Sequence, residues 1–138
     1  MSEMRSRRIA SAAEKRVGDR AIADKHGKLV MPTKYASRVR NLAVWIRESG
    51  LAQTLSFLRD KASDPENRAD GHVLVDLAAV LGSETGDELF ERLKNESDIG
   101  YRLLTRDAMV ACLWMKRACD YDRGSASNKA EGGEGRNP

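Results

Sequence analysis

The chain has 138 residues, enough for one domain with a compact core, and only 2 Trp, 3 Tyr and 2 Phe. The core must therefore come mainly from Leu, Val, Ile, Met and Ala, and this composition predicts an all-α protein, a compact bundle of about five to six helices. The absence of a long apolar run excludes a transmembrane helix, and without an export signal we expect a cytoplasmic protein.

The net charge of +3 hides an uneven distribution along the chain. Residues 1–40 hold 11 Lys and Arg against 4 Asp and Glu, whereas residues 50–100 hold 5 against 11. A basic face can attract a polyanion such as nucleic acid. Opposite charges in two parts of one chain can also attract copies of it head to tail. The alternative is the ordinary solvated surface of a helical protein.

The first predicted helix runs from Met4 to about His26. Apolar residues recur along it every four positions, as Ile9, Ala13, Val17 and Ala21. Because this stripe is thin, the helix depends for its stability on packing against the rest of the protein or a partner. Gly27 ends the helix, and residues 27–32 are expected to form a connector.

Two helices joined by a tight corner come next. The helix from Thr33 to Ser49 carries a strong core stripe at helical spacing, formed by Tyr35, Val39, Leu42, Ala43 and Ile46. Gly50 is expected to end it. The following helix runs from about Leu51 to Lys61, and its inward residues are Leu51, Leu55 and Leu58.

The middle of the chain predicts two shorter helices after a polar turn over residues 62–71. Residues 73–81 are apolar nearly all round, which fits a buried strand or a buried helix, and their two adjacent alanines favour the helix. Thr85 and Glu88 have the spacing of a capping box, which predicts a helix ending near Asn95.

The last predicted helix begins at Thr105, as N-cap, and ends near Tyr121. Residues 96–104, interrupted by Gly100, are expected to be a linker before it. Residues 1–121 are thus predicted to form a single helical domain. Residues 122–138 are rich in Gly, Ser, Asn and Glu, which predicts a disordered tail.

Residues with catalytic or metal-binding chemistry are scarce. His26 and His72 belong to no metal-binding motif, and phosphate-binding loops and nucleophile motifs are absent from the sequence. Cys112 and Cys119 lie about two helical turns apart, too far for a disulfide, so we expect reduced core cysteines. The sequence therefore predicts no enzymatic activity, no cofactor, no metal and no small-molecule substrate.

The second of the predicted helices presents a cationic face with one aromatic residue. Lys34, Arg38, Asn41 and Trp45 share the side roughly opposite its core stripe. Such a face suits single-stranded nucleic acid, because cations bind phosphates and an aromatic ring stacks on a base. Two other interpretations stay open: Trp45 packs against a neighbouring helix or another copy, and Lys34, Arg38 and Arg40 are solvated surface charges.

Two dense motifs carry a resemblance to a known family. The first is residues 50–58, GLAQTLSFL; the second is residues 101–109, YRLLTRDAM, which runs on to WMKR at residues 114–117. Their order and spacing, with the Tyr-Ala-Ser at residues 35–37, resemble over residues 34–120 the small all-helical subunit of the type III-B CRISPR effector, the Cmr complex.

This resemblance implies a non-catalytic subunit in antiviral defence, present in several stacked copies beside the backbone and large subunits and the guide RNA. A basic surface on those copies would follow single-stranded target RNA. The cations that the resemblance assigns to RNA are Arg102, Arg106, Lys116 and Arg117 in the motif, with Arg38 and Arg40 nearby; the helix-face argument adds Lys34. The apolar residues of the motifs are expected in the core: Leu51, Leu55, Phe57, Leu58, Leu103, Leu104 and Trp114.

Two other classes of protein fit the same features. One is the equivalent small subunit of a type III-A or type I CRISPR effector, and the other is a helical protein–protein adaptor with no RNA role. Salt-sensitive binding of single-stranded RNA would separate the adaptor from both kinds of effector subunit. Neighbouring genes for repeat-containing RNA-binding subunits would separate the two kinds of effector.

Overall fold

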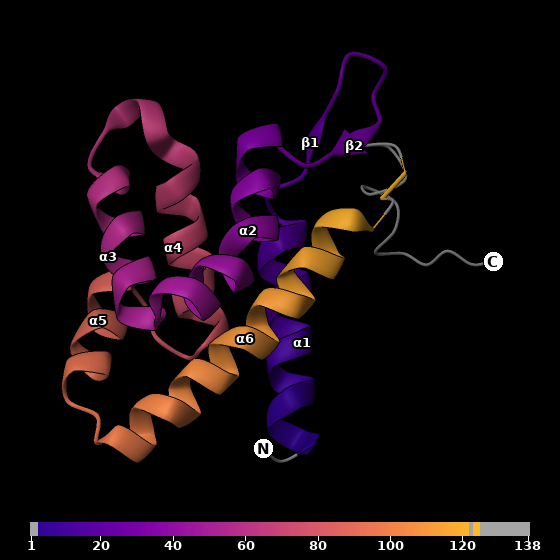
Figure 1. The fold of residues 1–138 in the computed structure, drawn as a ribbon. Helices are drawn as coiled ribbons and strands as arrows, with labels where there is room; N and C mark the ends of the chain where they lie inside the picture. Colours follow the sequence, from indigo (N-terminus) through magenta and orange to yellow (C-terminus); the bar gives the residue numbers. More distant parts are fainter. Residues whose placement is uncertain (1–2, 122, 125–138) are drawn as a thin grey trace.

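The computed structural model describes residues 3–121 and 123–124 and confirms the predicted helical bundle (Figure 1). Within these residues there are six α-helices, one 3-10 helix and a small two-stranded sheet. Their bounds are α1 (Glu3–Gly18), β1 (Ile22–Ala23), β2 (Leu29–Val30), α2 (Thr33–Ser49), α3 (Leu51–Ala62), η1 (Pro65–Asn67), α4 (Arg68–Val80), α5 (Gly86–Lys94) and α6 (Asp98–Asp120).

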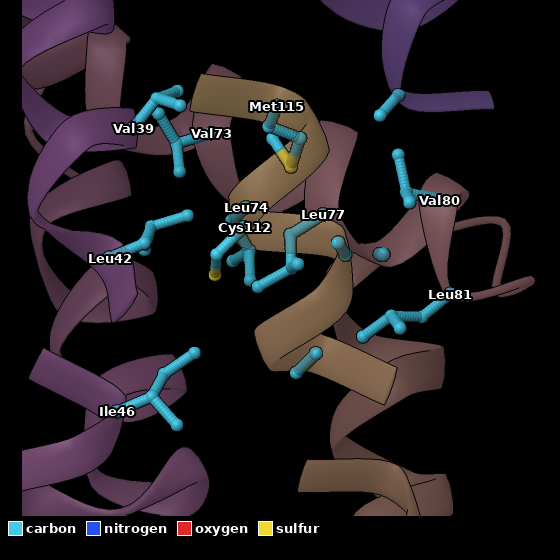
Figure 2. Close-up of a cluster of buried hydrophobic side chains, with 14 of the residues drawn as sticks. Val39, Leu42, Ile46, Val73, Leu74, Leu77, Val80, Leu81, Cys112 and Met115 are labelled. Carbon is cyan, nitrogen blue, oxygen red and sulfur yellow. The ribbon is translucent and has the colours of Figure 1, made fainter. Parts of the chain in front are cut away.

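The long helix α6 crosses the bundle and packs against α1 and α2, while α4 packs against α1, α2 and α3 (Figure 1). Side chains of α2, α4 and α6 meet in the core (Figure 2). Among them Leu42, Leu77 and Met115 are fully buried, one from each helix. At about 2 to 5 kcal/mol for truncating such a side chain, this three-helix contact is a major source of stability.

The first helix is shorter than predicted, because it ends at Gly18 and not near His26. The residues expected to continue it form an antiparallel hairpin in which β1 pairs with β2. The carboxylate of Asp24 accepts hydrogen bonds from the backbone N–H groups of His26 (2.8 Å) and Lys28 (2.9 Å). An Asp side chain that closes a turn in this way competes with helix formation. The connector predicted at residues 27–32 therefore contains β2.

The tight corner between α2 and α3 is confirmed at the predicted residue. Gly50 has a φ of 87°, and its N–H donates to the carbonyl of Ile46 at 2.8 Å. The hydroxyl of Thr54 donates to the Gly50 carbonyl at 2.9 Å. The backbone N–H of Ala52 donates to the Tyr101 hydroxyl at 3.1 Å. The corner thus joins the two sequence motifs, since Tyr101 begins the second one.

Helices α4 and α5 follow the predicted pattern. The apolar run at residues 73–81 is helical up to Val80, and α4 begins earlier, at Arg68, after η1. The predicted N-cap of α5 is confirmed, because the Thr85 hydroxyl accepts the Glu88 N–H at 3.0 Å. The Glu88 carboxylate accepts the N–H of Glu84, one residue before the N-cap, at 3.0 Å.

The predicted linker over residues 96–104 is wrong, because α6 already begins at Asp98. The Ser97 hydroxyl accepts the Gly100 N–H at 3.0 Å and caps the helix, and Asp98 favours the positive end of its dipole. Thr105 lies inside the helix and is not its N-cap. Its hydroxyl oxygen is buried and has no hydrogen-bond partner among the described residues.

Most of the predicted core residues of the two motifs are buried, but two are not. Leu51, Leu55, Leu58 and Leu104 are in the core, and Trp114 is half-buried; their positions are consistent with the prediction. Phe57 and Leu103 are 40% and 42% exposed, so the prediction that they lie in the core is wrong. Both lie on the outward sides of their helices, where they are free to contact something outside this chain.

Cys112 and Cys119 are unpaired and buried in the core. Burial raises the pKa of the Cys112 thiol to about 12 and that of Cys119 to about 11. Because the thiolate is the reactive form, both cysteines should react slowly with an aromatic disulfide reagent at pH 8 in the folded protein. Unfolding in urea should release both thiols to rapid reaction. Fast labelling of either cysteine without denaturant would contradict this burial.

The predicted disordered tail, residues 122–138, lies outside the described residues apart from Arg123 and Gly124. In the part of the chain that the structure describes, no helix is both long and apolar enough to cross a bilayer.

Candidate nucleic-acid interface

The cations of the second motif lie on the outward side of α6. Arg102, Arg106, Lys116 and Arg117 are all exposed, and none of them forms an ion pair with another described residue. Successive helical residues turn by about 100°, which places Arg102, Arg106 and Arg117 in one stripe and Lys116 at its edge. The stripe is roughly 22 Å long. Its positive charge is therefore not compensated within the described protein.

Apolar side chains share this outward side of α6. Ile99 is 70% exposed, and Leu113 and Leu103 are also exposed. The guanidinium carbon of Arg117 lies 4.8 Å from the centroid of the Trp114 ring, a cation–π contact that orients this charge. A surface that combines cations with exposed apolar groups suits a partner that combines negative charges with apolar or aromatic groups, such as a polyanion with stacking bases.

The arginine stripe continues into a hollow of about 420 Å³ between α1 and α6. Three arginines line it from three segments: Arg7 of α1, Arg117 of α6 and Arg123 beyond α6. Glu14 is the one acidic residue among its lining residues. Arg123 is held by a hydrogen bond from its guanidinium to the Tyr121 carbonyl at 2.9 Å. Sequence reasoning missed Arg7 and Arg123, because only the packing of α1 on α6 brings them beside Arg117.

The two predicted arginines of α2 form ion pairs with other helices. Arg38 Nε donates to the carboxylate of Asp70 on α4 at 2.8 Å, whereas Arg40 Nη2 donates to Asp120 at the end of α6 at 2.7 Å. Because they contact different helices, these two arginines lie on different sides of α2, and both are paired. Lys34 is exposed and forms no ion pair with another described residue.

Trp45 packs against a neighbouring helix, which confirms the structural interpretation of this residue. Its ring lies 5.4 Å from that of Phe57 on α3, at an interplanar angle of 67°. Such an edge-to-face contact is favourable beyond the burial of the rings. Trp45 is only half-buried, however, so part of its surface remains accessible.

Two arginines of the basic N-terminal segment form hydrogen bonds with a buried carboxylate. Asp76 of α4 is fully buried, and its carboxylate accepts hydrogen bonds from Arg16, Arg20 and Tyr35. The hydrogen bond to Asp76 raises the pKa of Arg20, and burial, with the nearby Asp76 carboxylate, raises that of Tyr35. Sequence reasoning missed this cluster, although a lone carboxylate in the apolar run 73–81 signals a buried partner.

Groups of three or more His, Cys, Asp and Glu side chains that could hold a metal ion do not occur among the described residues. The charges around α6 consist of a stripe of arginines without ion pairs to other described residues and the three-arginine hollow beside it, whereas Arg38 and Arg40 of α2 are paired.

Comparison with known proteins assigns the family. The sequence model of a family described as CRISPR-associated protein (Cas_Cmr5) matches residues 5–121, which include both motifs. The chain belongs to this family. The resemblance to the small subunit of the Cmr effector, read from the two motifs, is thereby confirmed.

Relatives of this Cmr5 family member agree with the assignment. The CRISPR system Cmr subunit Cmr5 of Thermus thermophilus is 34% identical over 84 residues, which cover 61% of this chain and 70% of that protein. The crystal structure of a CRISPR-associated Cmr5 family protein from the same bacterium is similar, with a TM-score of 0.68 and 29% identity. That likeness covers 84% of this chain and 95% of the other.

Proposed function

We propose that this Cmr5 family protein is a non-catalytic subunit of a type III-B CRISPR effector that holds single-stranded target RNA along α6. The observation that carries the proposal is the stripe of Arg102, Arg106 and Arg117, with Lys116 at its edge, whose charges form no ion pair with another described residue. Cations that are unpaired in the free protein can release counterions from RNA phosphates without first breaking an internal ion pair.

Contacts of this kind position a nucleic acid without reading its sequence. In an RNA-guided effector, base pairing with the guide RNA supplies the specificity, and the protein contributes contacts to the backbone. A subunit in this role needs no catalytic residues. The three-arginine hollow between α1 and α6 extends the same surface, so we add Arg7 and Arg123 to the proposed contacts. Arg38 and Arg40 are assigned to the packing of α2 instead.

The charge distribution also supports the stacking of copies that the family resemblance implies. The exposed side of α5 is acidic through Asp87, Glu88 and Glu91, whereas α1 carries exposed arginines such as Arg8. Head-to-tail contact between these two surfaces would bring opposite charges together, and the exposed apolar residues of α6 would face other subunits or RNA bases. The partners we propose are the backbone and large subunits of the effector, the guide RNA and the target RNA, in the cytoplasm.

The test is RNA retention by the reconstituted effector carrying Arg106→Glu with Arg117→Glu. We expect the affinity for target RNA to fall by about tenfold or more at moderate salt. The slope of log affinity against log salt should decrease by about one for each phosphate that the variant no longer binds. Retention is measured by filter binding over a salt series.

The matched control is Lys25→Glu with Arg68→Glu, which makes the same change of charge at exposed residues of the hairpin and α4 that form no ion pair with another described residue. This control should bind RNA as the unmodified complex does. Equal losses of RNA affinity in both variants would attribute the effect to overall charge. Full retention of RNA by the α6 variant would contradict the proposal and favour a protein–protein adaptor with no RNA role. Circular dichroism must find both variants folded.

A further inference from the structure

A second hollow, of about 310 Å³, lies where α2 meets α3. Its lining consists of Trp45, Ser49, Gln53, Thr54 and Phe57. Three of these residues belong to the first sequence motif, and the α6 stripe does not use any of them. The two aromatic rings form the apolar part of the hollow, and the side chains of Ser49, Gln53 and Thr54 form its polar part.

We propose that this hollow binds one unstacked base of single-stranded RNA, which stacks on the exposed ring of Phe57 beside Trp45 and pairs with the amide of Gln53. Phe57 is 40% exposed, which leaves a ring available for stacking. Stacking of a base on an aromatic side chain is favourable for every base and does not require a particular sequence.

The polar side of the hollow favours a base over an aliphatic side chain. Gln53 is exposed and forms no hydrogen bond with another described residue, so its amide offers a donor and an acceptor. Thr54 is buried, and its hydroxyl donates to the Gly50 carbonyl, so this residue fixes the shape of the hollow. The edge of a base carries donors and acceptors that can pair with the Gln53 amide, whereas an aliphatic side chain cannot pair with it.

Cations near the hollow could bind the phosphates on either side of the bound base. Lys61 Nζ lies 5.6 Å from the centroid of the Phe57 ring, at the α3 side of the hollow. Arg102 follows Tyr101 in the chain, and the Tyr101 hydroxyl contacts the corner that begins α3. Tyr101 thus connects the start of the arginine stripe to the corner at which α3 begins, and we expect one strand of RNA to contact both the stripe and the hollow.

This inference rests on the proposed function, because it takes RNA as the partner. Its first test is photo-crosslinking in the reconstituted effector with target RNA that contains 4-thiouridine, followed by mass spectrometry of tryptic peptides. Cleavage after Arg47 and Arg59 releases residues 48–59, which include Ser49, Gln53 and Phe57. We expect crosslinks to this peptide or to the one that contains Trp45.

The mapping also separates the two proposals. Crosslinks to α6 peptides without any to the hollow would overturn the base site and support the RNA path along α6. The absence of crosslinks from the whole subunit would overturn both proposals.

The second test is the variant Phe57→Leu, which removes the ring and retains an apolar side chain. We expect the affinity for target RNA to fall by about fivefold or more, because the variant loses the stacking of one base. The slope of log affinity against log salt should not change, because no cation is altered. The control Val75→Ala removes surface from an exposed apolar residue of α4 and should bind normally.

Unchanged affinity of Phe57→Leu would overturn the base site. If the variant is instead lost from the purified effector and no crosslinks to the peptides of the hollow are found, we would conclude that a neighbouring protein subunit occupies the hollow. That outcome would also overturn the base site.

Discussion

Replacing Asp76 by Asn should lower the free energy of unfolding by about 3 kcal/mol. The carboxylate is fully buried, and Arg16, Arg20 and Tyr35 all donate to it. Removing one partner of a buried pair typically costs about 3 to 5 kcal/mol, because the other charge is left uncompensated. The side chains of Arg16 and Arg20 are 38% and 24% exposed and can regain water, so the low end applies. Urea unfolding of the purified chain measures the change.

Two further variants separate this cluster from ordinary surface pairs. Tyr35→Phe removes one hydrogen bond of 2.6 Å to the same carboxylate and should cost about 2 kcal/mol. Asp120→Asn breaks the exposed pair with Arg40 and should cost less than about 1 kcal/mol. If Asp76→Asn were no more harmful than Asp120→Asn, the cluster would not be what fixes α1 to α4.

Sequence reasoning placed the α2–α3 corner correctly because two independent signals agree there. The apolar stripe of α2 has a clear helical period that ends at Ile46, and Gly50 can adopt a backbone conformation that other residues avoid. The apolar run 73–81 was assigned to a helix for a weaker reason, its adjacent alanines, and the structure confirms that assignment.

The two misplaced helix ends have a common physical cause. At each, a side chain hydrogen-bonds to nearby backbone N–H groups: Asp24 closes the hairpin turn, and Ser97 caps α6. Apolar periodicity does not report such local bonds, and α6 is capped by Ser97, eight residues before the expected Thr105. The choice between them depends on which segment packs, and that is a tertiary effect.

The candidate site was predicted in part. A helical wheel orders Arg106 and Arg117 on one side of the predicted last helix, and they do lie exposed on α6. Arg102 was expected in the linker and joins them because α6 begins at Asp98. The wheel cannot say which neighbouring helix faces each side of α2, so the pairing of Arg38 and of Arg40 was not foreseen. Both pairs join residues more than thirty positions apart in the chain, which only the folded structure brings together.

Replacing Gly50 by Ala should lower the free energy of unfolding by about 2 kcal/mol. Its φ of 87° and ψ of 159° define a region that is accessible almost only to glycine, and other residues are strained there by about 1 to 3 kcal/mol. Relaxation of that strain would shift the corner and the hydrogen bond from Ala52 to Tyr101, which joins the two motifs. Urea unfolding reports the stability, and near-ultraviolet circular dichroism reports the environment of Tyr101.

Gly71→Ala is the matched control, because the same methyl group is added where the backbone is already helical. Its Cβ would lie 3.4 Å from that of Ala62, an ordinary contact. Since glycine inside a helix is less stable than alanine by up to about 1 kcal/mol, this variant should be neutral or more stable. Opposite signs at the two positions would attribute the loss at Gly50 to backbone conformation. Equal losses would instead point to crowding by the methyl group, and the corner would then not require a glycine for its φ.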